Sequence, residues 1–344
     1  MNEFLQDLKK ITKNRYGRVA FPESTDLRVL QAINEILRDG VVASFLVFSR
    51  RSELHALARK NGLEEVLMQK KNILCVGEDV KFAPDEVSSF LKASMKGKSL
   101  ADAAIHELAA SPLYQAGYLL AKGDVDCVLA GTESTTADVI RAALRTVGKA
   151  EGVQTVSGAF IMQRQEEVYL FADCGVVIEP TPEELVDIAL ESRKTWEAIP
   201  SLVGIQARLA FLSFSTKGSA QHKAATKMAE AAQEVKKRAS ELLVDGELQF
   251  DAAFDQEIGL RKAPGSPVAG KANIFLFPDL GAANIAYKIT QRLAGFHAYG
   301  PLLQGLAKPY SDLSRGATVT DIVECTYINL LRAAKLAGIS LAND

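Results

Sequence analysis

The sequence predicts an α/β protein with two domains and mainly parallel sheets. Short apolar runs alternate with amphipathic stretches, a pattern typical of strands and helices that build a parallel sheet. The chain has 344 residues, more than the roughly 250 to 300 that one hydrophobic core usually holds. A polar connector at 149–152 marks a change in the pattern. We therefore expect a first domain from residues 1–149 with 305–344, and a second domain from 150–304.

The elements of the first domain follow from this alternation. A Ser-Thr-Asp sequence at 24–26 is typical of a helix start. The hydroxyls of Ser134, Thr135 and Thr136 precede another helix, in which spacing alone favours Arg141 as a solvated surface residue. The pattern predicts strands at 18–22, 44–48, 72–76 and 127–130, helices at 27–38 and 52–60, and a mostly helical stretch over 83–122.

The second domain is expected to begin with two adjacent strands, 155–162 and 168–171, joined by a charged turn. The elements expected after them are a helix from Pro182, a strand at 209–214, a helix at 221–242, a strand at 272–277, a helix at 282–293 and an extended segment to Gln304. The last helix, 321–336, is expected to return to the first domain, which would place the preceding segment at an active-site cleft between the domains.

That preceding segment, 312–321, concentrates reactive side chains. It contains Ser314, Arg315 and two carboxylates, and Gly316 lets the backbone turn sharply. The spacing Thr-x-x-Asp before the last helix predicts that Asp321 lies in the first helical turn. Arginine offers a planar fork for phosphate or carboxylate. Taken alone, Asp321 is more simply explained as a charge that stabilises the helix start.

Other polar clusters are weaker candidates for ligand contact. The segment 213–219, between a strand and a helix, could hold an anion or form a well-capped turn. Residues 245–251 are either acids of a site or a polar turn, and 262–271 is too rich in proline and glycine for regular structure. Lys288 and Arg292 share one helix face, where surface charge is the simpler interpretation.

Composition excludes several classes of function. The net charge is −2 and the basic residues form no runs, so no nucleic-acid partner is expected. The first ten residues lack the apolar run of a signal peptide, and the apolar stretch 41–48 is too short to span a membrane. A cytoplasmic protein is therefore expected. The four cysteines have no metal or disulfide spacing, which predicts buried free thiols, and the four histidines are too scattered for a metal site.

Five segments together resemble the phosphate acetyltransferases, of the phosphate acetyl/butyryltransferase family. The stretch from Ser134 to Arg145 is similar as well, and the similarity extends over essentially the whole chain. The segments are 213–220 (SFSTKGSA), 245–253 (DGELQFDAA), 262–273 (KAPGSPVAGKAN), 284–293 (NIAYKITQRL) and 304–316 (QGLAKPYSDLSRG).

The resemblance implies reversible acetyl transfer between coenzyme A and phosphate in a homodimer, without metal or redox cofactor. It also implies two α/β domains with the active site in the cleft between them. The family's catalytic serine, arginine and aspartate fall on Ser314, Arg315 and Asp321, and its substrate-binding arginine falls on Arg141. Further substrate or coenzyme A contacts are expected at Thr135, Thr136, Ser215, Thr216, Lys217, Gly218, Ser219, Lys262, Lys288 and Arg292.

One position departs from the family pattern. A second arginine is expected in the helical region before Gly97, where this chain has only Lys92 nearby. A lysine supplies charge without a bidentate fork, so this substrate contact is in doubt. Asp312 is interpreted as a turn-forming residue and not as a catalyst.

Chemistry suggests how these residues would act. Asp321 could accept the thiol proton while the coenzyme A sulfur attacks the carbonyl of acetyl phosphate. Ser314 would orient the thiol or hold the oxyanion, and Arg315 with Arg141 would grip phosphate. No covalent acyl-enzyme is needed when both substrates are held together.

Three alternatives remain open from the sequence. A phosphate butyryltransferase, or another acyl-chain specificity, differs only in pocket volume, which no motif reports. A non-catalytic acetyl-coenzyme A sensor would have a degraded Ser/Arg/Asp set, whereas Ser314, Arg315 and Asp321 are all present. A two-domain decarboxylating dehydrogenase would need a cluster of metal-binding aspartates, and the sequence offers none.

Overall fold

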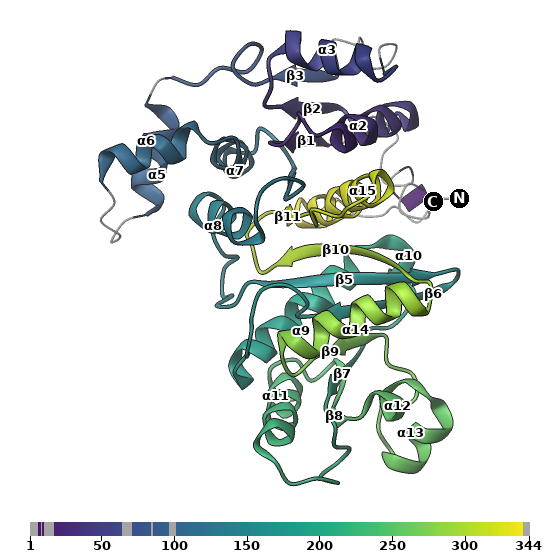
Figure 1. Cartoon of the computed structure of the whole chain (residues 1–344). Helices are drawn as coiled ribbons and strands as arrows, with labels where there is room; N and C mark the ends of the chain where they lie inside the picture. Colours follow the sequence, from purple (N-terminus) through teal and green to yellow (C-terminus); the bar gives the residue numbers. More distant parts are fainter. Residues whose placement is uncertain are drawn as a thin grey trace. The chain divides into compact units, whose positions relative to one another are not determined.

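The chain forms two compact units that each combine sheet and helix, which confirms the predicted α/β class (Figure 1). Unit 1 consists of Met1–Ala150 with Leu306–Asp344, and unit 2 of Glu151–Gly305. The computed structural model describes residues 6–7, 9, 17–63, 71–83, 85–95 and 101–339, apart from the side chain of residue 203.

Unit 1 contains a five-stranded sheet in the order β11-β4-β1-β2-β3. Every neighbouring pair of these strands is parallel. Its strands are β1 (Arg18–Phe21), β2 (Ser44–Val47), β3 (Ile73–Cys75), β4 (Cys127–Ala130) and β11 (Tyr310–Asp312). Its helices are α2 (Leu27–Asp39), α3 (Arg51–Lys60), α5 (Glu86–Ser94), α6 (Asp102–Ala110), α7 (Pro112–Lys122), α8 (Thr136–Thr146) and α15 (Val319–Leu336).

The strand order brings three loops of unit 1 together. Strand β4 lies between β1 and β11, and its Ala130 pairs with Asp312 at the carboxyl end of β11. Because parallel strands end at the same edge of a sheet, the loops that follow β1, β4 and β11 emerge side by side. These loops carry residues 22–26, 131–135 and 313–318.

The core of unit 1 is an apolar layer between the sheet and its helices. Phe21 of β1 and Phe45 of β2 are fully buried, and their rings stack with centroids 6.2 Å apart. Ile33 of α2 and Tyr327 of α15 are fully buried as well. Helix α15 contacts both α2 and β4, so the last helix of the chain is part of this core.

Unit 2 contains a six-stranded mixed sheet in the order β10-β5-β6-β9-β7-β8. Strands β10, β5 and β6 are antiparallel neighbours, whereas β6, β9, β7 and β8 run parallel. Its strands are β5 (Ser157–Arg164), β6 (Glu167–Ala172), β7 (Arg208–Leu212), β8 (Leu243–Leu248), β9 (Ile274–Leu276) and β10 (His297–Gln304). Its helices are α9 (Pro182–Glu197), α10 (Pro200–Val203), α11 (Lys223–Arg238), α12 (Phe250–Phe254), α13 (Gln256–Lys262) and α14 (Leu280–Leu293).

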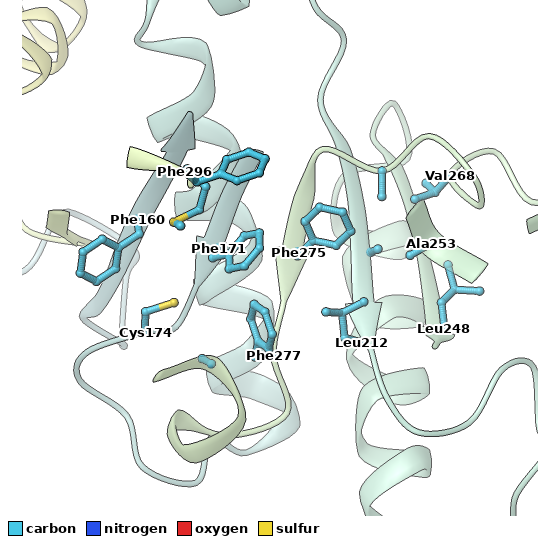
Figure 2. Packing of buried hydrophobic residues seen from close by; sticks show 14 of the residues in the cluster. Phe160, Phe171, Cys174, Leu212, Leu248, Ala253, Val268, Phe275, Phe277 and Phe296 are labelled. Atoms are coloured by element: carbon cyan, nitrogen blue, oxygen red, sulfur yellow. The ribbon is translucent and has the colours of Figure 1, made fainter. Parts of the chain in front are cut away.

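Aromatic rings fill one face of the unit 2 sheet. Figure 2 shows Phe171 of β6, Phe275 of β9 and the neighbouring Phe277 close together in this cluster. The ring centroid of Phe171 lies 5.6 Å from that of Phe275 and 5.2 Å from that of Phe277. On the other side of Phe275, Leu212 and Leu248 extend the cluster across β7 and β8. This continuous apolar layer anchors the parallel strands from which the loops of unit 2 emerge.

Two segments differ from the sequence prediction. The helix expected at 221–242 ends at Arg238, and strand β8 follows from Leu243. A Cβ atom on Gly246 would lie 2.6 Å from Cβ of Phe211, so this strand position needs glycine for close packing and not for a turn. Asp312 was interpreted as a turn-forming residue, but it is the buried last residue of strand β11.

The four cysteines are free and buried, as predicted. Among the described residues, no helix has the length and apolar character needed to cross a bilayer.

Candidate functional site

The segment after β11 forms a tight turn that leads into α15. The amide of Gly316 donates to Oγ of Ser314 (3.2 Å), and the amide of Ala317 donates to the Ser314 carbonyl (2.8 Å). The side chains of Ser314 and Arg315 are exposed at this turn. The predicted pair of hydroxyl and guanidinium is therefore presented to solvent on a backbone that is held by its own hydrogen bonds.

Asp321 lies in the first turn of α15, as its spacing from Thr318 predicted. The amide of Thr318 donates to Oδ2 of Asp321 (2.9 Å), and the amide of Asp321 donates to Oγ1 of Thr318 (3.2 Å). This reciprocal capping box satisfies two amides that the helix leaves unpaired. Within the described part of the chain, Oδ1 of Asp321 has no hydrogen-bond partner. One oxygen of this carboxylate thus has a structural role and the other is available to a ligand.

The start of α8 lies beside this segment. Thr135 caps the helix by accepting the Asp138 amide (3.2 Å), and its own hydroxyl donates to Oδ2 of Asp138 (2.7 Å). Arg141 donates to the other oxygen, Oδ1 of Asp138 (2.6 Å), in an exposed ion pair. The hydrogen bonds from Thr135 and Arg141 lower the pKa of Asp138, so its carboxylate stays charged.

A hydrogen bond joins these two predicted segments. Thr136 Oγ1 donates to Oδ2 of Asp312 (2.6 Å), although the two residues are 176 positions apart. Asp312 is 1% exposed, and its burial raises the pKa of its carboxyl to about 6. The nearby charge of Glu23 raises this pKa further, whereas the Thr136 bond lowers it. The structure thus brings the hydroxyls at the start of α8 and the Ser-Arg turn to one edge of unit 1.

Gly131 permits the close approach of these loops. Its φ is +105°, a conformation that residues with a side chain rarely adopt. A Cβ atom there would collide with Oδ1 of Asp312 and with the carbonyl oxygen of Leu313. The Leu313 amide also donates to the Ala130 carbonyl (2.5 Å). Any side chain at position 131 would therefore push apart the two loops that carry the predicted residues.

The loop after β1 contributes Glu23, which sequence reasoning missed. Glu23 is 8% exposed and accepts the amides of Gly131 (2.7 Å), Thr132 (2.6 Å) and Ser134 (2.7 Å). The Thr132 hydroxyl donates to it as well (2.8 Å). Burial raises the pKa of Glu23, but these hydrogen bonds outweigh burial and leave the pKa below its usual value. Glu23 therefore acts as a buried anion that shapes the loop before α8.

Arg28, at the start of α2, was also missed. Its guanidinium donates to the carbonyls of Arg315 (2.7 Å), Ala317 (2.9 Å) and Thr132 (3.1 Å). The same group is held by the carboxylate of Asp26, whose other task is to cap α2 through the Arg28 amide (2.8 Å). The signal available in the sequence was a group of charged residues directly after a buried strand, where buried charges need a partner.

The predicted residues of segment 215–219 form a dense polar network at the end of β7 and β8. The Ser215 hydroxyl and the Gly218 amide both donate to Oε1 of Glu247, at 2.8 and 2.7 Å. The Ser219 hydroxyl accepts the Thr216 amide (3.0 Å) and contacts the Ser215 hydroxyl (3.3 Å). In this structure the donors of segment 213–219 bind a carboxylate of the chain itself, which is the arrangement of a well-capped turn.

Lys217 joins the same network through a second buried carboxylate. Its Nζ donates to Oδ1 of Asp245 (2.5 Å), and the same oxygen accepts a hydrogen bond from Nζ of Lys236 (2.9 Å). Ser266 donates to Oδ2 of Asp245 (2.5 Å). Burial raises the pKa of Asp245, but the bonds from Lys217, Ser266 and Lys236 outweigh it and lower the pKa overall. Asp245 is thus a structural anion beneath the loop.

The remaining basic residues are less constrained. Lys262 donates to Oδ2 of Asp251 (2.8 Å) and to Oε1 of Gln249 (3.0 Å). Lys288 and Arg292 are exposed on α14, with Lys288 5.7 Å from the centroid of the Tyr287 ring. Lys92, the residue near the missing arginine, is paired with Asp102 at 2.7 Å on an exposed surface.

The predicted residues therefore form two groups. Thr135, Thr136, Arg141, Ser314, Arg315 and Asp321 lie in unit 1, and the predicted residues from Ser215 to Arg292 lie in unit 2. A cavity of about 440 Å³ in unit 1 contains no predicted site residue; it is lined by Gly77, Lys81, Phe82, Ala83, Val87, Ser88, His106, Ala109, Ala110 and Gln115. Among the residues that the structure covers, no three His, Cys, Asp or Glu side chains are grouped to hold a metal.

Relatives and solved structures resemble this chain along almost its whole length. The phosphate acetyltransferase of Bacillus subtilis is 39% identical over 322 residues, covering 92% of this chain and 94% of the relative. That of Acetivibrio thermocellus is 38% identical over 336 residues, with 96% and 98% covered. A phosphotransacetylase from Streptococcus pyogenes superposes with a TM-score of 0.86 at 36% identity, with 96% of this chain and 98% of that chain covered.

A second solved structure, the EutD phosphotransacetylase from Staphylococcus aureus, superposes with a TM-score of 0.83 at 35% identity, with 96% and 98% covered. The fold and these relatives define an acyltransferase. The chain belongs to the phosphate acetyl/butaryl transferase family, which matches residues 3–330.

Proposed function

We propose that this protein catalyses reversible acetyl transfer between acetyl-coenzyme A and inorganic phosphate, giving acetyl phosphate and coenzyme A. The observation that carries the proposal is the Ser314-Arg315 turn, with Asp321 in the first turn of the helix that follows it, at the same sheet edge as the start of α8. The curated relatives named phosphate acetyltransferase support the acetyl group as the transferred unit.

The reaction can be written from acetyl phosphate. The coenzyme A sulfur attacks the carbonyl carbon, and its proton passes to Oδ1 of Asp321. The new C–S bond forms, the C–O bond to phosphate breaks, and phosphate leaves with the electron pair of that bond. Asp321 suits this role because its Oδ2 is fixed by the Thr318 amide, which holds the carboxylate in one orientation. Both substrates react directly, so no acyl-enzyme is needed.

Two arginines would bind the transferred and leaving groups. Arg315 is exposed, and its backbone is fixed by Arg28, so its guanidinium is free to take up phosphate at a set position. Arg141 uses Nη1 for Asp138, which leaves other donors of its fork for a phosphate oxygen. Positive charge placed where an oxyanion develops lowers the barrier to acyl transfer. Ser314 would orient the thiol or donate to that oxyanion.

The residues proposed to contact coenzyme A include Thr135 and Thr136 of unit 1 and the predicted basic and hydroxyl residues of unit 2. Their support is the resemblance of segments 213–220, 262–273 and 284–293. In unit 2 the hydrogen bonds within the chain also fit a capped turn. Coenzyme A would therefore be bound there by side chains that remain partly exposed, such as Lys217. Formation of a homodimer and a cytoplasmic location stay predictions, and sedimentation at micromolar concentration tests the first.

A thiol assay tests the proposed function. The purified protein should consume the free thiol of coenzyme A when acetyl phosphate is added, and should release it from acetyl-coenzyme A when phosphate is added. Side-by-side assays with acetyl-, propionyl- and butyryl-coenzyme A report the acyl preference. Faster turnover with butyryl-coenzyme A would replace acetyl by butyryl transfer, and a bound but unreacted thioester would indicate a sensor.

A further inference from the structure

We infer that Arg28 is a positioning residue for the reaction, which fixes the Ser314-Arg315 turn through its carbonyl oxygens without touching substrate. This inference rests on the proposed function. It starts from an asymmetry in the turn. The amides of Gly316, Ala317 and Thr318 have partners in Ser314 and in the α15 capping box, whereas two carbonyls of the turn accept from a side chain in another part of the chain. Arg28 lies 287 positions from Arg315 in the sequence.

The contacts of Arg28 hold the turn in a fixed position relative to the loop before α8. Nη1 donates to the carbonyls of both Arg315 and Ala317, at 2.7 and 2.9 Å, so one nitrogen holds the two ends of the short segment that presents the Arg315 side chain. Nη2 donates to the Thr132 carbonyl (3.1 Å), in the loop before α8. One guanidinium therefore couples both predicted catalytic loops of unit 1.

The guanidinium itself is held rigidly. Asp26 accepts from Nε (3.1 Å) and from Nη2 (2.5 Å) of Arg28, in a forked pair in which the Asp26 side chain is 9% exposed. Asp26 is fixed in turn because it caps α2. A planar fork with five N–H donors can serve a carboxylate and three carbonyls at once, whereas the ammonium of lysine has three donors and no plane.

Glu23, a carboxylate, binds the loop before α8 at the same edge of the sheet as Arg28. Its carboxylate binds the amides of Gly131, Thr132 and Ser134, while Arg28 binds the Thr132 carbonyl. The loop before α8 is therefore held at its donors by Glu23, in the segment after β1, and at an acceptor by Arg28, at the start of α2. Loss of Arg28 would remove the hydrogen bonds that connect the Ser314-Arg315 turn with residues 22–28 in the described structure.

The decisive variant is Arg28→Met, which keeps the aliphatic stem and removes every donor. Its matched control is Arg18→Met. Arg18 also binds a backbone carbonyl, that of Gly123 (2.6 Å), and an aspartate, Asp126, but it lies at the other end of β1. We expect kcat of Arg28→Met to fall by about 30- to 100-fold, with the KM for coenzyme A within about threefold, because a displacement of about 1 Å can cost on the order of 10²-fold in rate. Arg28→Lys should recover only part of kcat.

A second readout does not depend on activity. Trypsin cleaves after Arg315 only when the turn opens into an extended form, so the rate of cleavage at the Arg315-Gly316 bond, followed by mass spectrometry, measures local opening. This rate should rise about tenfold or more in Arg28→Met and stay at the wild-type value in Arg18→Met.

The two readouts separate the possible failures. If the wild-type protein has no acyltransferase activity, the proposed function is wrong, and the cleavage rates still test the role of Arg28. If Arg28→Met does not fold, Arg28→Lys is measured in both assays. Equal cleavage rates and equal kcat in the Arg28 variant and in Arg18→Met would overturn the inference.

Discussion

Thr136 and Asp312 are joined by a 2.6 Å hydrogen bond from Thr136 Oγ1 to a carboxyl group that is almost completely buried. The bond connects the first residue of α8 with the last residue of β11. Burial raises the pKa of Asp312 from 3.8 to about 6. The folded protein therefore binds this proton more tightly than the unfolded chain does, which makes the residue a source of pH-dependent stability.

The first prediction concerns that stability. Between pH 3.8 and about 6 the unfolded chain loses the Asp312 proton while the folded protein keeps it. The stabilising contribution is thus complete below about pH 4 and is lost as the pH rises through about 6. Relative to Asp312→Asn, wild-type protein should lose on the order of 3 kcal/mol between pH 4 and pH 8, measured by urea unfolding.

Asp138, a carboxylate whose pKa is shifted in the opposite direction, serves as the control. The pKa of Asp138 is lowered by Thr135 and Arg141, so its stabilising contribution is present above its unfolded pKa and is lost as the pH falls. The difference between wild type and Asp138→Asn should therefore change in the opposite direction. A pH-independent difference for Asp312→Asn would show that its carboxyl group is not perturbed.

Gly131→Ala should destabilise the protein and reduce its activity. The φ of +105° strains any side chain, and the new Cβ would collide with Asp312 and Leu313. We expect a loss of about 3 kcal/mol. In Gly148→Ala the φ is +75° but nothing lies within 4 Å of the new Cβ, so only the backbone strain of about 1 to 2 kcal/mol remains. Equal losses in the two variants by urea unfolding would refute the proposed collision.

Sequence patterns predicted the features that depend on neighbours along the chain. The α15 cap was readable because Thr318 and Asp321 are three residues apart and bond each other. The role of Glu23 was not readable, because its partners lie more than a hundred positions away and become neighbours only through the strand order. Asp312 is a similar case: it is buried in β11, a strand that pairs with β4 from a distant part of the sequence.

Strand β8 was missed for a related reason. Its sequence, LVDGEL, has the composition of a polar turn. In the structure Asp245 and Glu247 are satisfied by lysines and by loop hydroxyls and amides, so the strand tolerates both charges. Local propensity cannot report partners supplied by other segments. The same limit applies to Lys217, because its partner Asp245 lies 28 positions away and the sequence of the loop does not indicate it.

Arg141→Ala should impair the use of acetyl phosphate more than the binding of coenzyme A. Loss of its guanidinium removes charge from the proposed phosphate site, so kcat/KM for acetyl phosphate should fall on the order of 10²-fold. Initial rates at varied concentrations of each substrate measure the two effects. Arg164→Ala, which breaks an exposed ion pair of the same spacing with Glu167, is the control. A selective loss of coenzyme A affinity in Arg141→Ala would contradict the assignment.

Lys217→Met tests the proposed coenzyme A contact in unit 2. Lys217 and Lys236 bind the same oxygen of Asp245, and their side chains are 40% and 45% exposed. Lys236→Met is therefore a matched control for the loss of this ion pair. Steady-state kinetics should show a KM for coenzyme A about tenfold higher in Lys217→Met alone, the equivalent of about 1.4 kcal/mol. Equal KM values in both variants would leave segment 213–219 as a capped turn.

The central claim is that Asp321 takes the thiol proton, and the kcat of Asp321→Asn tests it most directly. Asparagine keeps the size of the side chain and an oxygen for the Thr318 amide, but it cannot serve as a base at neutral pH. Thr318→Ala is the control, because it weakens the helix cap by about 1 kcal/mol and leaves the carboxylate in place. The account predicts that kcat falls by on the order of 10²-fold or more in Asp321→Asn and stays within about threefold of wild type in Thr318→Ala. Near-normal turnover by a folded Asp321→Asn protein would contradict it.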